Sequence, residues 1–490
     1  MMKRFYNCNN RLFIAVGFIF LYTCQTSCKK FIQVEAPGNS TNAENVYKDD
    51  AIAASVLTGI YATLSRGNTD GSFEGAGDFT SLSLFPSLSA DELTLFDLNK
   101  QTYFLYYSNS LSANPGNIGL PSYWNIIYPY IFVANSAIDG LNTSTTLTPR
   151  VKQQLLGEAK FIRAFCYFYL VNLYGDVPLS LTDDWKVNSS MPRTSASQIY
   201  DQIISDLKEA QELLSTDYLS SDASSVTSAR VRPNKWVAAA LLARTYLYIN
   251  DFSNAEIEAS KIIDNGSYQL VSLNNVFLKD SKEAIWQLQA VGTGTNSNTG
   301  EGKLFVLPST GPTVNQPVYL SDYIVNTFEA GDLRKINWIA KAGTTSYCYP
   351  AKYKIGAINT TAKENCTVFR LSEQYLIRAE ARARQNKLPG AIADLDSVRK
   401  RANISLMATT NPGIDQTALI DKIIHERQVE LFTEWGHRWF DLKRTNIINT
   451  IMPSITIVKN GTWEKTDQLY PIPQSEINKA PQIIQNSGYE

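Results

Sequence analysis

The feature that most constrains this fold is an internal repeat of two helical pairs. Residues 243–264 (ARTYLYINDFSNAEIEASKIID) align with residues 379–400 (AEARARQNKLPGAIADLDSVRK), and Asn250 matches Asn386 where the pattern breaks between two helices. In both segments small alanines stand where two helices would approach each other closely. A pair of short amphipathic helices cannot bury its apolar face alone and must stack on a neighbouring pair. The repeat therefore predicts stacked helical pairs within a larger fold.

Longer helices are predicted in the first half of the chain. Apolar residues recur at helical spacing over residues 123–141 and 149–174, and the second run stops at Gly175. Ser195 and Gln198 form the pattern of a capping box ahead of another amphipathic run. These signals predict at least three further helices besides the repeated pairs.

Two stretches interrupt the helical pattern. Residues 68–122 and 290–318 are rich in Gly, Ser, Thr and Asn and show no sustained periodicity. A long irregular stretch inside a folded domain is usually functional or disordered. The sequence thus predicts a mostly α fold in which tetratricopeptide-like helical pairs support long irregular loops, with a little β structure.

The composition excludes some functions and leaves others open. The 490 residues include 45 Lys and Arg against 46 Asp and Glu, so the chain lacks the basic surplus of a nucleic-acid-binding protein. Only 2 His are present, which argues against a histidine-based metal site, and no cofactor motif stands out. The 26 Tyr and 8 Trp suit either a core or flat faces for a ligand.

The N-terminus has the pattern of an export signal. Lys3 and Arg4 precede an apolar run over 12–22, which is shorter than the roughly 20 residues that span a bilayer. Small residues then lead to Cys28, which we interpret as the cleavage and lipid-attachment site; Cys24 is the alternative. We expect residues 1–27 to be a lipoprotein signal peptide and 28–45 to be a lipidated tether. The mature part then divides into 46–232 and 233–490 within one compact fold.

Candidate ligand-binding residues lie in and near the irregular stretches. Residues 91–107 (DELTLFDLNKQTYFLYY) combine aromatic rings with carboxylates and an amide. Sugars stack their C–H faces on such rings and bond their hydroxyls to such polar groups. The competing interpretation is that these rings pin a loop to the core. The candidates are Asp91, Phe96, Asn99, Tyr103, Phe104, Tyr106, Tyr107, Tyr319, Tyr323, Trp338 and Tyr347.

A dense polar cluster near the C-terminus admits two interpretations. Glu426, Glu430 and Glu434 fall at i, i+4 and i+8, so one helical face carries all three. Paired carboxylates suit glycoside hydrolysis, but the interleaved arginines and lysines would lower carboxylate pKa values, whereas a general acid needs a raised pKa. We therefore predict a structural salt-bridge network and no catalytic residue. Whether Cys348 and Cys366 form a disulfide stays open at this point.

Several blocks, in order along the chain, resemble the SusD/RagB family of outer-membrane nutrient-binding lipoproteins. The resemblance lies in residues 27–37 (SCKKFIQVEAP), 123–139 (YWNIIYPYIFVANSAID), 157–179 (GEAKFIRAFCYFYLVNLYGDVPL), 369–385 (FRLSEQYLIRAEARARQ), 391–404, 426–446 and 469–489. The resemblance implies a SusD-like fold and a partnership with a TonB-dependent, SusC-like outer-membrane transporter. It also implies an oligosaccharide, or in some members a peptide, as ligand. It transfers no ligand residue, because the matched blocks are helical scaffold.

These observations predict a lipid-anchored, surface-exposed binding subunit of the outer membrane, without enzymatic activity, that delivers a nutrient to its transporter. Two alternatives remain. One is an α-helical glycoside hydrolase that uses Glu430 and Glu434. The other is a tetratricopeptide-type scaffold that binds only proteins.

Overall fold

The computed structural model describes residues 43–65, 79–114, 122–290, 298–356 and 363–489. The expected signal peptide, its Cys28 and most of the tether lie outside these residues, as do 68–78 and 115–121 of the first irregular stretch and 291–297 of the second. Contacts group residues 47–490 into one unit, whose fold is described here.

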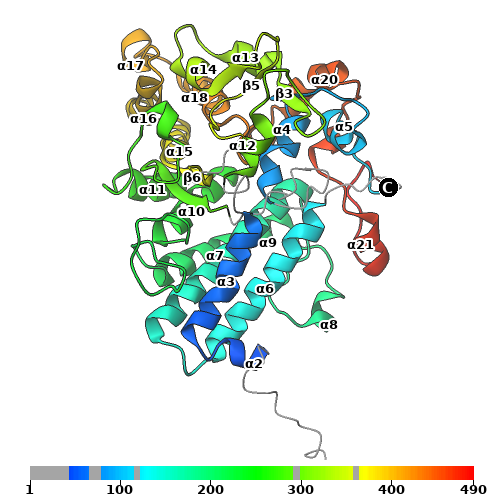
Figure 1. Ribbon diagram of the computed structural model, residues 1–490, viewed down its shortest axis with the longest axis vertical. Helices are drawn as coiled ribbons and strands as arrows, with labels where there is room; N and C mark the ends of the chain where they lie inside the picture. Colours follow the sequence, from blue (N-terminus) through cyan, green and yellow to red (C-terminus); the bar gives the residue numbers. More distant parts are fainter. Residues whose placement is uncertain (1–42, 66–78, 115–121, 291–297, 357–362, 490) are drawn as a thin grey trace, which may run out of the picture. The chain divides into compact units, whose positions relative to one another are not determined.

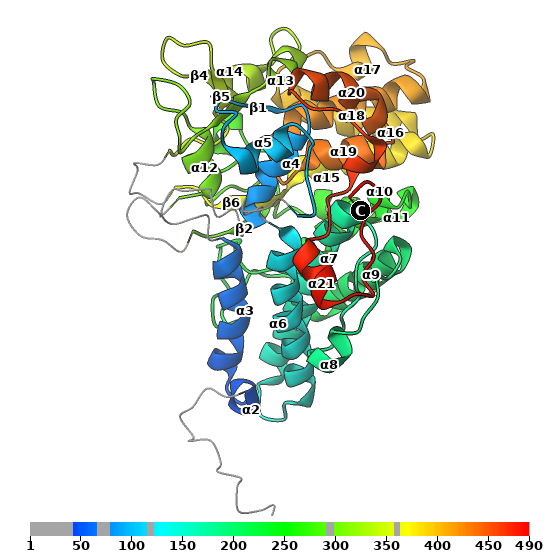
Figure 2. The ribbon, with the colours of Figure 1, turned by 90° about the vertical axis from the view of Figure 1, so that its right-hand side faces the viewer.

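Four helices of the first half lie side by side (Figures 1 and 2). They are α3 (Asp50–Leu64), α6 (Tyr123–Thr143), α7 (Pro149–Tyr174) and α9 (Ala196–Leu213). The predicted helices over 123–141 and 149–174 are therefore confirmed. α7 starts with a proline in its first turn and stops at Gly175, whose φ of 73° favours glycine. Ser195 caps α9, because its hydroxyl accepts the backbone N–H of Gln198 at 3.4 Å.

α7 forms the centre of this unit, and it is buried on nearly all sides. Phe161, Phe165 and Tyr169 lie one helical turn apart; each ring contacts the next along the helix, and those of Phe161 and Phe165 also contact Trp286. The centroid of Trp286 lies 5.2 Å from that of Phe161 and 5.4 Å from that of Phe165, both edge to face. Edge-to-face pairs each contribute about 0.5–1.5 kcal/mol beyond the burial of their area.

The internal repeat folds into two helical pairs, as predicted. The first pair is α10 (Lys235–Tyr248) with α11 (Phe252–Ile263), and the second is α15 (Leu371–Arg384) with α16 (Leu388–Arg401). Asn250 and Asn386, one in each turn, both adopt a left-handed backbone, with φ of 63° and 60°. Asparagine tolerates this conformation better than most residues. α11 packs against α15, so the pairs stack on each other.

The β structure consists of three separate two-stranded antiparallel sheets among the described residues. β1 (Leu93–Leu95) pairs with β3 (Val318–Leu320), β2 (Ala284–Leu288) with β6 (Cys366–Arg370), and β4 (Ile339–Lys341) with β5 (Cys348–Pro350). The mostly α fold with a little β structure is confirmed.

Shorter helices complete the described residues, and they correct one prediction. Residues 68–122 were predicted to be irregular, yet their described part contains α4 (Phe85–Ser89), α5 (Gln101–Tyr107) and β1. The second stretch predicted to be irregular, 290–318, likewise contains α12 (Gly300–Phe305). Leu and aromatic side chains bury these short elements in the core. The remaining elements are α2 (Ala43–Val46), η3 (Phe79–Ser83), α4 (Phe85–Ser89), α5 (Gln101–Tyr107), α8 (Trp185–Asn188), η4 (Leu273–Asn275), α12 (Gly300–Phe305), α13 (Asp322–Thr327), α14 (Leu333–Trp338), α17 (Met407–Thr410), α18 (Gln416–Leu431), α19 (His437–Arg444), α20 (Ile448–Val458), η6 (Lys465–Gln468) and α21 (Gln474–Lys479).

Candidate functional site

Three aromatic rings from distant parts of the chain meet at the β1–β3 sheet. We call Phe96, Tyr319 and Tyr347 the aromatic platform. The ring centroids of Phe96 and Tyr347 lie 5.6 Å apart and perpendicular, and those of Tyr319 and Tyr347 lie 4.9 Å apart at 67°. Phe96 is 47% exposed, and the two tyrosines are half-buried. All three rings were predicted ligand candidates, and the structure brings them together.

The alternation of side chains along β1 and β3 places two of these rings outside. Leu93 and Leu95 of β1 are buried, and so are Val318 and Leu320 of β3. Because successive strand residues point to opposite faces, Tyr319 and the residue after β1 point away from that core. The Phe96 N–H donates to the Pro317 carbonyl at 2.8 Å, which extends the pairing and fixes Phe96 beside β3.

Two glycines allow the third ring to reach the platform. A side chain at Gly311, whose φ is 96°, would lie 2.9 Å from the ring of Tyr347. A side chain at Gly343, in the turn between β4 and β5, would lie 2.3 Å from the Ser309 carbonyl oxygen. The loop around 309–311 and the turn before Tyr347 therefore pack this closely only because both positions lack a side chain.

Further predicted candidates surround the platform. Thr94 pairs with Tyr319 across the β1–β3 sheet, and Tyr107 lies near both residues. Tyr107 is only 6% exposed and belongs to the core, so we leave this predicted candidate out of the proposed site. Burial, together with the nearby Tyr319, raises the pKa of Tyr107 to about 12. Tyr323 on α13 is 46% exposed. Asn99 is exposed in the turn after β1, where its backbone and side-chain N–H groups both donate to Asp97.

Other candidates lie in the interior, which corrects their expected role. Trp338 is fully buried, and its indole N–H donates to the Leu273 carbonyl at 2.9 Å. Tyr103 packs its ring against Phe85 in the core, and Phe104 is partly buried against the same core. These three rings pin their segments to the core, as the competing interpretation held, and we leave them out of the proposed site.

Asp91 is also buried, and it forms an ion pair. Its two carboxylate oxygens accept from Nε and Nη2 of Arg438 at 2.8 and 2.6 Å. Burial alone would raise the pKa of Asp91, but Arg438 outweighs it and lowers that pKa below its ordinary value. This ion pair joins the segment before β1 to α19. Asp91 therefore helps to hold the β1–β3 sheet in place, and its carboxylate is not accessible to a ligand.

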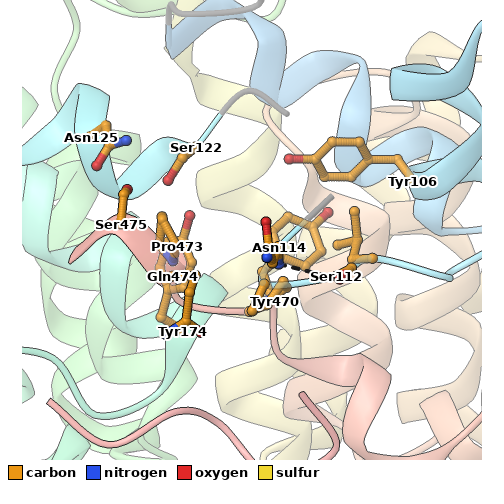
Figure 3. A pocket seen from close by; sticks show the side chains of 13 residues that line it. Tyr106, Ser112, Asn114, Ser122, Asn125, Tyr174, Tyr470, Pro473, Gln474 and Ser475 are labelled. Atoms are coloured by element: carbon orange, nitrogen blue, oxygen red, sulfur yellow. Dashed lines mark hydrogen bonds between the residues drawn. The ribbon is translucent and has the colours of Figure 1, made fainter. Parts of the chain in front are cut away.

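Tyr106 lines a cavity of about 220 Å³ (Figure 3). Tyr174 and Tyr470 contribute further rings to its wall, and Figure 3 shows Asn125 and Ser475 next to each other at one end. The Tyr106 and Tyr470 centroids lie 5.3 Å apart. This cavity is small compared with the roughly 300–1,000 Å³ of typical ligand pockets. Tyr106 therefore faces a cavity, but not the platform.

The glutamate row on α18 is a buried ionic network, as predicted. Glu430 accepts from Arg334 at 3.0 Å and from Arg370 at 2.5 Å, and it also contacts Arg401. Burial opposes ionisation, but these three guanidinium groups hold the pKa of Glu430 well below its ordinary value. Glu434 accepts from Arg370 at 2.7 Å and from Lys352 at 2.5 Å. Neither carboxylate is accessible to a substrate, which removes the geometric basis of the hydrolase alternative.

Two open points concern cysteines and metals. Cys366 donates to Glu301 at 3.0 Å, and Cys348 lies 3.9 Å from the Ser346 carbonyl, so these two cysteines are not joined to each other. Across the parts of the chain that the structure describes, no group of three or more His, Cys, Asp or Glu is placed to hold a metal ion. Within the same ranges, no helix has the length and hydropathy needed to cross a membrane.

Sequence reasoning missed one set of aromatic residues. Trp124, Tyr128 and Phe132 follow one face of α6 and line a larger cavity of about 640 Å³. Their spacing of four residues indicates one face of the predicted helix, but it does not show whether that face borders the core or a cavity.

Two family models match the chain. The model described as "SusD family" matches residues 323–489, and the model described as "Starch-binding associating with outer membrane" matches residues 87–247. The SusD-like protein P38 of Formosa agariphila is 27% identical over 100% of both chains.

Solved structures share the fold. The surface glycan-binding protein A of Bacteroides uniformis has a TM-score of 0.74 at 21% identity, covering 90% of this chain and 100% of that one. A laminarin-binding SusD-like protein has a TM-score of 0.71 at 24% identity, with the same two coverages.

Proposed function

Because this chain belongs to the SusD family, we propose that it captures an oligosaccharide at the cell surface with the aromatic platform. The proposed contacts are Phe96, Asn99, Tyr319, Tyr323 and Tyr347. The family model described as starch-binding and outer-membrane-associated supports both the ligand class and the location, as do the glycan-binding and laminarin-binding proteins of the same fold.

One observation carries this proposal: three half-exposed rings from residues 96, 319 and 347 meet at different angles on one side of a rigid sheet. A planar ring stacks on the C–H face of a sugar, and rings at steep angles follow the turns of a glycan chain. The half-buried edges fix each ring in place, so little side-chain entropy is lost on binding.

Polar groups around the rings supply hydrogen bonds to sugar hydroxyls. The Tyr319 hydroxyl has a raised pKa, because burial and the nearby Tyr347 disfavour its anion, so it remains a neutral donor and acceptor. Asn99 and Asp97 expose an amide and a carboxylate next to Phe96. Donors and acceptors at the rim of an aromatic surface favour a saccharide over a purely apolar ligand.

A binding panel tests this proposal. We expect the purified chain to bind at least one of laminarihexaose, maltoheptaose and xylohexaose in isothermal titration calorimetry. Phe96→Ala/Tyr347→Ala should weaken that binding by more than about tenfold, which corresponds to about 1.4 kcal/mol. Ile457→Ala is the matched control, because Ile457 is an exposed apolar residue on α20.

The proposal fails if the double variant binds as tightly as the wild type. It also fails if none of the three saccharides binds while a short peptide does, because the ligand class would then be wrong. A chain that binds neither, yet co-purifies with a transporter, would support the protein-scaffold alternative.

We further propose that Cys28 carries the lipid anchor and that the chain delivers its ligand to a SusC-like, TonB-dependent transporter. The apolar run over 12–22 and the small residues before Cys28 support the anchor. We expect Cys28→Ala to move the protein from the membrane fraction to the soluble fraction. Retention of lipid in that variant would assign the anchor to Cys24 instead. Co-purification of a large barrel protein with the wild type tests the partnership.

We propose no catalytic activity and no cofactor. Glu430 and Glu434 both form ion pairs with Arg370 and neighbouring cations. Such pairing favours the ionised carboxylate, whereas a general acid needs a raised pKa. Incubation with laminarihexaose should release no reducing sugar. Release that Glu430→Gln abolishes, in a variant that remains folded, would overturn this view.

A further inference from the structure

A second cavity lies along α6, away from the platform. Its volume is about 640 Å³, within the range of pockets that hold small ligands. α6 forms one wall, the segment over 178–191, which contains α8, a second, and α21 with the residues after it a third. In both Figures 1 and 2, α6 and α21 lie well apart from the β1–β3 sheet. The cavity shares no residue with the platform.

The α6 wall is a row of aromatic rings. Trp124, Tyr128 and Phe132 are spaced by four residues and therefore lie on one helical face. Their exposure rises along the row: Trp124 is 4% exposed, Tyr128 is half-buried and Phe132 is 47% exposed. Trp124 contacts Tyr128 with a centroid distance of 5.0 Å, which fixes the inner part of the row. Phe132 and the outer part of Tyr128 remain available to a ligand.

Pro129 leaves a backbone acceptor in the same wall. Proline has no N–H, so Pro129 cannot donate the helical hydrogen bond that the Asn125 carbonyl would otherwise accept. Both residues line the cavity, and both are exposed. The carbonyl and the side-chain amide of Asn125 thus add an acceptor and a further donor–acceptor pair to an aromatic wall.

Hydrogen bonds hold the opposite wall in place. Asn135 on α6 donates to the Ser180 carbonyl at 3.1 Å, and the Tyr128 hydroxyl donates to the Pro178 carbonyl at 2.9 Å. From the other side, Gln482 donates to the Ser189 carbonyl at 2.9 Å. The cavity is therefore preformed, which lowers the entropy cost of binding.

The rim is polar and nearly uncharged overall. Glu476 and Lys479 on α21 pair with each other at 2.8 Å and are both accessible, so neither presents an isolated charge to a ligand. Asn125 and Ser475 also line the smaller cavity of Figure 3, so the two cavities adjoin. A neutral ligand longer than one unit can therefore extend from the larger cavity toward the smaller.

We propose that this cavity is a second binding site for a short neutral saccharide. Stacking on Phe132 and hydrogen bonding to Asn125, Glu476 and Lys479 match the C–H faces and hydroxyls of a sugar. A purely apolar ligand would leave these polar groups without partners, which costs free energy. The inference goes beyond capture on the platform and stands on different residues.

Fluorine NMR tests this site directly. 4-Fluorophenylalanine is placed at position 132 in one sample of the full chain and at position 96 in another, and laminarihexaose, maltoheptaose and xylohexaose are titrated into both. We expect a saturable shift of the signal from position 132. Ala480→Phe fills the cavity and should abolish that shift, while the signal from position 96 responds as before.

Each outcome decides the point. A shift at position 96 alone refutes the second site and leaves the platform proposal standing. A shift at position 132 alone supports the second site and counts against the platform. A shift at 132 that persists in Ala480→Phe places the ligand outside the cavity and overturns the assignment. If no saccharide shifts either signal, or if only a Leu-Phe dipeptide shifts position 132, the saccharide assignment is wrong.

Discussion

The ionic network around α18 and the aromatic platform invert the usual distribution of side chains. In the network, Glu430, Arg334 and Arg370 are almost completely buried. On the platform, Phe96 and its two tyrosine neighbours face outward, and Phe96 is 47% exposed. Charges lie inside and flat rings lie outside, which is the opposite of what residue type alone would suggest.

Pairing explains the difference between these two regions. Each buried charge of the network contacts several groups of opposite sign, so no charge is left without compensation. The platform rings instead contact one another edge to face and remain partly exposed. A residue's role here follows from its partners, and the network provides stability while the platform provides a surface for a ligand.

The largest effect should come from breaking the network. Arg370→Met leaves Glu283, Glu430 and Glu434 with one cation fewer in the interior. Loss of one member of a buried ion pair costs about 3–5 kcal/mol, so the urea midpoint should fall strongly. Lys479→Met removes the exposed pair with Glu476 and should cost less than about 1 kcal/mol. If the two variants lose similar amounts of unfolding free energy, the buried network around α18 does not stabilise the fold more than an exposed ion pair does.

The next effect concerns Glu92, which lies between the two regions just before β1. Burial, reinforced by Asp91 and opposed by the Ser87 hydroxyl, raises its pKa from 4.5 to about 7. A carboxyl with a raised pKa stabilises the folded state below its unfolded pKa, and this contribution is lost as the pH rises through 7. Between pH 5 and pH 8, the wild type should lose roughly 2–3 kcal/mol relative to Glu92→Gln. Urea denaturation curves of both proteins across this pH range measure their free energies of unfolding. A difference between the two proteins that does not change with pH would refute the prediction.

A third pair of variants separates stability from binding. Trp338→Phe removes a buried hydrogen bond to the Leu273 carbonyl and leaves a gap, so we expect a loss of about 1–3 kcal/mol in stability and unchanged affinity. Tyr347→Leu should show the reverse: an unchanged melting temperature and an affinity lower by about fivefold to thirtyfold. Calorimetry of both variants, by heating and by titration with laminarihexaose, measures the two quantities. If Trp338→Phe alone weakens binding, the division between core and platform is wrong.

The smallest effect should come from the platform rim. Asn99→Ala removes one exposed amide whose partner within the protein is Asp97. One hydrogen bond contributes about 0.5–1.5 kcal/mol, so affinity should fall by less than about tenfold with no change in stability. Titration calorimetry with the same saccharide measures it, and a change larger than that of Tyr347→Leu would move the centre of the site to this turn.

The sequence predicted the helices well because their signals are local. Gly175 ends α7 and Asn250 and Asn386 make the two matching turns, each through its own backbone preference. Glu426 and Glu430 lie one turn apart on α18, so their shared face was also predictable.

The site was harder to predict because it depends on contacts between distant residues. Trp338 and Tyr347 are aromatic residues only nine positions apart, yet one is buried and the other reaches the platform. What separates them is the pairing of β4 with β5 and the space left by Gly311, which no local pattern encodes. The cavity along α6 was missed for the same reason, since its other walls come from residues 178–191 and from α21.

A crystal structure of the chain with laminarihexaose or maltoheptaose, whichever binds more tightly, tests the central claim most directly. We predict a sugar ring in van der Waals contact with Tyr347 and a neighbouring unit against Phe96, while the ionic network around α18 keeps its contacts. Saccharide density elsewhere, with the faces of both rings still open to solvent, would contradict the claim that the platform captures the ligand.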